Sequence, residues 1–335
     1  MGASWSSWGA TTVYTETGIE LQFADSSHRM PQHGVKFASL AYQNLIYALG
    51  KARRRPQELE VLLRRSLLRD SAFYIPEFLQ PTVDPVLHEL KTLLLRVDVI
   101  DNSIHTHTNG TVVDMKSGYR LRRFLGHTPN LTHLRLNLQT YNITENEDFL
   151  RWLALPPSIP TSSPTAFFDP PPIALQSLAK LEFGQFKARA NIILDVFSKF
   201  APTLRDISLW RMTLVPGTGP SYALEPNLWA TFFSKLARMP QLKLNSLKAG
   251  MLSQGNDHVQ FKDLTIKDAP ALTSKEYTGN NMDAFLQELM EEVFVVSLPW
   301  APDDGDEDLL MHLVGFDDEG EDQEDGEDDD IGDGE

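Results

Sequence analysis

The sequence predicts an α/β protein whose strands and helices alternate in an irregular curved solenoid, with parallel strands on the concave face and helices on the convex face. The first observation is a repeated pattern of Pro, Leu, two variable residues, an aliphatic residue and a second Leu, at residues 129–136, 202–209 and, more loosely, 240–247. Pro ends a helix, and the Leu spacing after it is typical of a short strand in a stacked core. The second observation is that amphipathic stretches separate these strands, which predicts a parallel sheet.

Composition divides the chain into four predicted regions: an N-terminal segment that is partly disordered (1–33), a helical N-terminal cap (34–86), a degenerate leucine-rich-repeat-like domain (87–298) and a disordered acidic tail (299–335). In the first region, alternation over residues 18–23 predicts an edge strand. In the cap, apolar residues at helical spacing predict one helix over residues 35–50 and a second that begins at Pro56. Such a pair would close the N-terminal end of a repeat stack.

The repeat region contains five predicted strands: one in the last part of the leucine run at residues 87–95, and four at residues 131–138, 178–183, 204–209 and 242–247. Their aliphatic positions lie 41, 47, 26 and 40 residues apart, whereas ordinary leucine-rich repeats run about 20 to 29 residues. The longer units therefore carry insertions, and the Pro-rich residues 156–172 are the clearest one. Helices are predicted at 188–200, 227–238 and, closing the C-terminal end, 282–295.

The acidity of the chain is confined to its C-terminal end. The formal net charge is −16, but residues 303–335 hold 18 of the 46 acidic residues and no Lys or Arg, so the remaining chain has a balance of +2. A nearly neutral body does not steer nucleic acid toward it, and we expect no nucleic-acid partner. The acidic runs repel one another, which predicts disorder and an attraction for basic proteins.

The chain has no cysteine, which excludes disulfides, thiol catalysis and Cys-ligated zinc. No apolar run approaches the roughly 20 residues of a membrane span, and the first residues lack the charged and apolar regions of a secretory signal. We therefore expect an intracellular protein of the cytoplasm or nucleus, with no membrane partner.

Residues 131–136 and 204–210, the latter followed by residues 228–233, resemble filamentous-fungal F-box and leucine-rich-repeat-like proteins over residues 35–261. The resemblance implies a substrate-recognition component of a cullin ubiquitin ligase, in which an F-box binds a Skp-type adaptor and the repeats hold the substrate. The usual Leu-Pro-x-Glu start of an F-box does not occur before Gln57, so the F-box itself is not evident.

Motifs of catalysis are absent from the sequence. There is no nucleophile elbow, phosphate-binding glycine loop or dinucleotide fingerprint. His105 and His107 have a spacing that can chelate a metal, but no third ligand lies nearby, which favours exposed loop histidines. We therefore expect that the protein is not an enzyme and that it has no catalytic residue, cofactor or metal site.

A protein partner is expected to contact the strand residues beside the Leu positions, because successive strand side chains point to opposite faces. These candidates are His133, Arg135, Asn137, Arg205, Ser208 and Arg211. Trp210 and Trp229 lie within apolar runs and are expected in the core rather than as exposed anchors.

A basic cluster lies in the predicted cap and consists of Lys51, Arg53, Arg54, Arg55, Arg64, Arg65 and Arg69. It fits either a docking surface for acidic protein, RNA or the chain's own tail, or the solvated face of a helix pair. The second interpretation is favoured because no aromatic residues for base stacking accompany the charges.

Two hypotheses on function follow. The first is a protein–protein interaction scaffold, linked by resemblance to ubiquitin ligase as a substrate adaptor. The alternative, based on the acidic tail, is a nuclear chaperone that binds histones or other basic proteins, because an acidic run competes with DNA for such partners.

Overall fold

The computed structural model describes residues 10–14, 18–23, 32–63, 67–99, 105–108, 111–114, 118–138, 143–157, 170–217, 227–262, 266 and 269–297. The predicted disordered tail and the middle of the predicted insertion lie outside the described residues. Among the described helices, none is both long enough and apolar enough to cross a membrane.

The described residues form a mixed α/β fold. The helices are α1 (Gln32–Lys51), α2 (Gln80–Glu89), α3 (Tyr119–Gly126), α4 (Ile143–Ala154), α5 (Ala190–Phe200), α6 (Leu228–Ala237), α7 (Met282–Glu292) and the 3-10 helix η1 (Asp70–Phe73). The strands of the central sheet are β1 (Ala10–Tyr14), β2 (Gly18–Phe23), β3 (Glu58–Leu63), β4 (Leu68–Arg69), β5 (Thr92–Asp98), β8 (His133–Leu138), β9 (Lys180–Gly184), β11 (Asp206–Trp210), β13 (Ser246–Gly250) and β16 (Ser274–Thr278).

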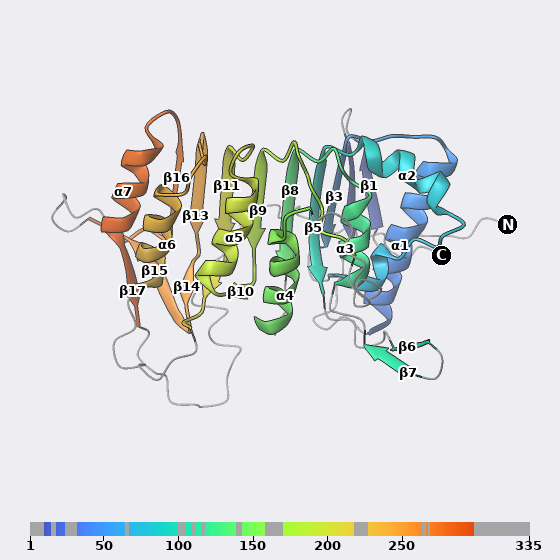
Figure 1. Cartoon of the computed structure of the whole chain (residues 1–335), viewed down its shortest axis with the longest axis horizontal. Helices are drawn as coiled ribbons and strands as arrows, with labels where there is room; N and C mark the ends of the chain where they lie inside the picture. The colour runs from blue at the N-terminus through green and yellow to red at the C-terminus, as the bar shows by residue number, and fades with distance from the viewer. Residues whose placement is uncertain are drawn as a thin grey trace, which may run out of the picture. The chain divides into compact units, whose positions relative to one another are not determined.

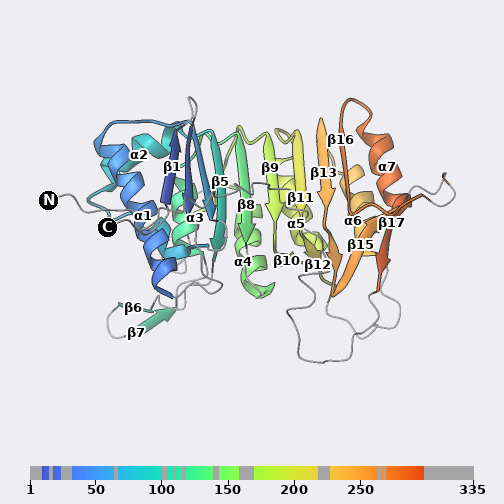
Figure 2. The same cartoon turned by 180° about the vertical axis from the view of Figure 1, so that it is seen from behind.

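The central sheet is mainly parallel, which confirms the predicted fold class at this level. From β2 through β3, β5, β8, β9, β11 and β13, neighbouring strands are parallel and follow the order of the chain. Antiparallel strands β1 and β16 flank this run. The helices lie on one face of the sheet, and the strands face the viewer when the molecule is turned (Figures 1 and 2).

Successive parallel strands begin with the same hydrogen-bond arrangement. The residue just before one strand has a backbone carbonyl that accepts two hydrogen bonds. The donors are the N–H groups of two successive residues where the next strand begins, at N···O distances of 2.7 to 3.2 Å. The accepting carbonyls belong to Gln57, Lys91, Thr132, Ala179 and Arg205. Because the arrangement recurs five times, it aligns the strand starts along the sheet.

The last three parallel strands end in the same left-handed corner. Gln185, Arg211 and Met251 follow β9, β11 and β13 with φ angles of 62°, 55° and 53°. Their N–H groups donate to backbone carbonyls of the adjacent strand or segment at 2.8 to 3.0 Å, which holds a backbone conformation that L-residues seldom adopt. After each corner the chain enters a second sheet, formed by β10 (Lys187–Ala188), β12 (Thr213–Leu214), β14 (Ser253–Gln254), β15 (Asp257–Phe261) and β17 (Val293–Val296).

The core lies between the central sheet and the helices. The aliphatic strand positions counted in the sequence are register partners across five neighbouring strands and are at most 2% exposed; they are Leu93, Leu134, Leu181, Ile207 and Leu247. Facing helices contribute aromatic rings such as Phe197 and Phe232, whose centroids are 6.3 Å apart. The 3.6-residue period of the predicted helices at 188–200 and 227–238 therefore reflects real packing against this sheet.

The second cap helix predicted from Pro56 is wrong, because residues 58–63 form strand β3. Leu59, Val61 and Leu63 are buried and alternate with other residues, so the period is two rather than 3.6. Parallel pairing with β2 on one side and β5 on the other decides between the two conformations. The helix predicted over residues 35–50 is confirmed as α1.

Other elements also differ from the prediction. Residues 87–89 of the leucine run belong to α2, so β5 begins only at Thr92, and β2 pairs with both β1 and β3 and is therefore not an edge strand. The last predicted helix ends at Glu292, and residues 293–296 form β17, which pairs with β15. The fifth predicted strand begins at Ser246 rather than Leu242. His105 and His107 lie in strand β6 (His105–Thr108), which forms a hairpin with β7 (Thr111–Asp114), rather than in a loop.

Candidate functional site

The candidate site lies on the face of the central sheet that is opposite the helices, and no described element covers it (Figure 2). In β8, buried and half-buried residues alternate along the whole strand, so that Arg135 lies on this open face and Leu134 does not. Strand register then places one residue of each strand in a row across the face: Glu60, Leu94, Arg135, Glu182, Ser208, Lys248 and Glu276. The row is mostly polar and contains charges of both signs.

Glu182 on β9 is the centre of a charge cluster in this row. Its Oε1 atom lies 2.7 Å from His133 Nε2 and 2.8 Å from Lys180 Nζ. Its Oε2 atom accepts a hydrogen bond from Arg135 Nε at 2.8 Å, and Arg135 Nη1 also donates to Glu60 Oε1 at 3.2 Å. The Glu182 side chain is only 11% exposed, so its carboxylate is largely shielded from water, whereas Arg135 and Lys180 are half-exposed.

The cluster holds Glu182 in its ionised form. Burial by itself raises the pKa of this carboxyl, but the hydrogen bonds from His133, Arg135 and Lys180 outweigh burial and hold the pKa well below its usual range. Such a carboxylate is a weak base at neutral pH. The depressed pKa therefore disfavours proton transfer at this residue.

Trp210, the last residue of β11, lies beside the cluster, with its ring against Gly250 of the neighbouring strand β13. A Cβ atom on Gly250 would come within 2.2 Å of the indole Cζ3 atom, so the ring lies directly against the β13 backbone. On the other side, a Cβ on Gly184 would come within 2.4 Å of Asn137 Oδ1. The absence of side chains at these two positions makes room for the flat indole and for the Asn137 amide.

A hollow of about 290 Å³ is formed where the charge cluster meets the indole. Its lining comes from β8, β9, β11 and β13 and consists of Arg135, Asn137, Glu182, Phe183, Ser208, Trp210 and Lys248. Lys248 Nζ lies 5.2 Å from the centroid of the Trp210 ring, a cation–π distance, and 3.1 Å from Glu276 Oε2. The hollow therefore combines the half-buried ring of Trp210 with polar side chains such as Arg135 and Asn137.

Four of the six residues predicted to contact a partner lie on this face, namely His133, Arg135, Asn137 and Ser208. Arg205 does not, because β11 begins at Asp206 and the Arg205 guanidinium donates to the carbonyls of Leu204 and Pro202 at 2.7 and 3.0 Å. Arg211 lies in the left-handed corner, where the alternation of the strand has ended. Two causes lower the pKa of Arg96 on β5: burial, which is the larger, and the positive charge of Arg211.

Sequence reasoning missed Lys180, Glu182 and Lys248 as members of the site. The alternation rule that selected Arg135 also selects these residues, since they flank the buried Leu181 and Leu247. Trp210 was expected in the core, but it is half-buried on the open face. Trp229 is a core residue as predicted, with no exposed surface and its indole nitrogen bonded to the Ser253 carbonyl at 2.8 Å.

The basic cluster predicted in the cap is only partly described, because Arg64 and Arg65 lie outside the described residues. Residues 51–55 are exposed at the end of α1, and Arg55 pairs with Glu89 at 3.7 Å. Arg69 is half-buried in β4. Within the part of the chain that the structure covers, no three metal-ligating side chains gather at one place.

No protein-family model matches the chain. A search of curated proteins also finds no match to it. The fold and the site define a mixed α/β protein whose mainly parallel sheet has helices on one face and a polar, hollowed surface on the other.

Proposed function

We propose that the repeated units form an irregular leucine-rich-repeat-like solenoid, with parallel strands on a concave face and helices on a convex face. Two regularities support this proposal: the carbonyl arrangement that recurs at five successive strand starts, and the left-handed corner that recurs after three successive strands. Each regularity identifies equivalent positions in neighbouring units, as a repeat architecture requires.

The protein acts as a protein–protein interaction scaffold, and the open sheet face is its recognition surface. The observation that carries this proposal is the hollow around Trp210, which lies on a face without covering helices. Trp and Arg dominate the binding energy of protein interfaces when they lie in well-packed pockets. Here Gly250 of β13 makes room for the Trp210 ring, and the ionised Glu182 orients Arg135 by a hydrogen bond, before a partner arrives.

The partner proposed for this surface is a substrate protein of a ubiquitin ligase, as the sequence resemblance implies. In that role the N-terminal part of the chain would bind a Skp-type adaptor. A pull-down with a purified Skp-type adaptor tests this part separately: absence of binding removes the ligase role and leaves the recognition surface as proposed.

The recognition surface is tested by proximity labelling with the full chain as bait. Trp210→Ala removes the indole, and Ser208→Arg fills the hollow from its middle strand. Phe78→Ala is the matched control, because Phe78 is an aromatic residue that is 80% exposed and does not line the hollow. We expect both site variants to lose the same set of labelled proteins, whereas the control keeps it. If the site variants label the same proteins as wild type, the proposal is wrong.

A second candidate function rests on the acidic tail, whose 18 acidic residues without any Lys or Arg favour basic partners. In this function the chain is a chaperone for histones or other basic proteins. A truncation after Pro302 distinguishes the two functions. Loss of histone binding upon truncation would support the chaperone, and histone binding that survives truncation would refute it.

A further inference from the structure

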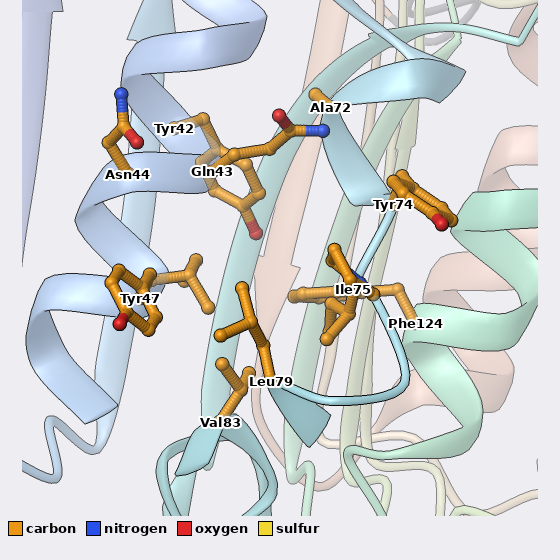
Figure 3. Close-up of a pocket in the computed structure, with 12 residues that line it drawn as sticks. Tyr42, Gln43, Asn44, Tyr47, Ala72, Tyr74, Ile75, Leu79, Val83 and Phe124 are labelled. Atoms are coloured by element: carbon orange, nitrogen blue, oxygen red, sulfur yellow. The ribbon is translucent and has the colours of Figure 1, made fainter. Parts of the chain in front are cut away.

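A second cavity lies on the helical side of the molecule, away from the open sheet face. It has a volume of about 280 Å³ and lies between α1, η1, the segment that follows η1, α2 and α3 (Figure 3). Among the described residues, no charged side chain lines it, and most of its lining is aliphatic or aromatic. An engineered apolar cavity of about 150 Å³ binds benzene, so this cavity has room for a body of one or two rings.

Tyr42 places a single polar group at the inner end of this cavity. Its side chain projects from α1, and Figure 3 shows its oxygen directed into the space between Ile75, Leu79 and Val83. The residue is 1% exposed, and its ring is held by Phe73, at a centroid distance of 5.4 Å.

The Tyr42 hydroxyl is buried and has no hydrogen-bond partner among the described residues. Burial raises the pKa of Tyr42 above its ordinary value, so the phenol keeps its proton and remains a donor. A buried hydroxyl without a partner carries an unrecovered desolvation cost. A ligand that accepts this hydrogen bond would recover that cost.

Among the described lining residues, only Tyr42 has a buried polar side-chain atom without a hydrogen-bond partner; the other polar ones are Gln43, Asn44, Tyr47 and Tyr74. Gln43 Nε2 already donates to the Ser71 carbonyl at 2.6 Å, which ties α1 to η1 beside the cavity. The mouth is bounded by the segment after η1, where Tyr74 is 50% exposed and Ile75 and Leu79 are half-buried. An entering molecule therefore meets the side chains of Tyr74, Ile75 and Leu79 before it reaches the Tyr42 hydroxyl.

We propose that this cavity binds a small, uncharged, mostly apolar molecule whose carbonyl or hydroxyl oxygen accepts a hydrogen bond from Tyr42. The absence of charged lining residues excludes a charged ligand, because an ion would lose its hydration without gaining a counter-charge. The volume limits the ligand to about one or two rings. The site is separate from the proposed recognition surface, and neither proposal depends on the other.

The test uses two probes with the same bicyclic body, 1-indanone and indane, which differ in the ketone oxygen. Dissociation constants for the full-length chain are measured by ligand-observed NMR titration at pH 7. We expect wild type to bind indanone about fivefold to tenfold more tightly than indane, the ratio that one net hydrogen bond supplies. Tyr42→Phe should remove this preference and still bind both probes.

Two further variants keep the test decisive. Leu79→Trp places a large side chain in the cavity and should abolish binding of both probes. Phe78→Ala changes the adjacent exposed residue outside the lining and should leave both constants unchanged. Circular dichroism on each variant verifies folding. The proposal is overturned if wild type binds neither probe, or if Tyr42→Phe retains the preference for indanone.

Discussion

The replacement Glu182→Gln tests whether the charge cluster on the open face is a structural element of the sheet. The carboxylate accepts from His133, Arg135 and Lys180 at 2.7 to 2.8 Å and is 11% exposed. A hydrogen bond to a charged group contributes about 1.5–3 kcal/mol. The glutamine keeps one acceptor oxygen, and the half-exposed Arg135 and Lys180 regain water, so we expect a net loss of about 2 kcal/mol in the free energy of unfolding.

The assay is urea denaturation at pH 7, with Glu276→Gln as the matched control. Glu276 lies in the same row of the sheet face and pairs with Lys248 at 3.1 Å, but its side chain is 55% exposed. A surface ion pair of this kind contributes under about 1 kcal/mol. The reasoning is refuted if the two variants lose equal stability, because burial is what distinguishes the two carboxylates.

The pH dependence of the same variant provides a second check. Because the folded-state pKa of Glu182 is depressed, its stabilising contribution is complete above the ordinary Glu pKa of about 4.3. Below that pH the unfolded chain takes up a proton that the folded chain does not, so wild type loses stability. The difference between wild type and Glu182→Gln should therefore shrink between pH 5 and pH 3. A constant difference over this range would contradict the assigned cause.

Three other predictions concern the helical side. Tyr42→Phe should leave the free energy of unfolding unchanged or raise it by up to about 1 kcal/mol, because it removes an unpartnered hydroxyl; a loss in urea denaturation would reveal a missed partner. Burial lowers the pKa of Lys199 to about 8, so stability should rise from about pH 8 to the ordinary Lys pKa of about 10.4, where the unfolded chain binds more protons; an NMR titration midpoint near the ordinary value would contradict this. Asn227 caps the N-terminus of α6 and donates to the Val293 carbonyl at 2.8 Å; Asn227→Ala should cost about 1–2 kcal/mol in urea denaturation, against a smaller cost for the control Asn227→Ser, which keeps a capping oxygen.

The strands of the core were predictable because burial imposes a strict period on them. Each unit has one aliphatic strand residue, such as Leu134 or Ile207, that must face the helices. Aligning the repeated sequence pattern on these residues gives the register partners that the structure has. The same alternation placed His133 and Ser208 on the open face. Arg211 does not follow this alternation, because it lies in a left-handed corner just after the strand and no local residue type announces that corner.

The segment after Pro56 shows where a local pattern is ambiguous. Four leucines between residues 59 and 67 fit a helix, yet three buried positions at alternate residues form β3. Only the neighbouring strands β2 and β5, which bond to both edges of the segment, decide for the strand. Tertiary pairing overrides a helical pattern in such a case.

The amino-acid sequence by itself determined the alternating fold class and the buried aliphatic positions of the central strands, because apolar residues must leave water whatever the partner strand is. Only the tertiary structure decided what the polar residues do. Glu182 and Arg135 are 47 residues apart, and whether the Tyr42 hydroxyl finds a partner among the described residues depends on the segments that surround it. Hydrogen bonds and cavities depend on distances of a few ångströms between such remote segments, and these distances arise only when the whole sheet and its helices assemble.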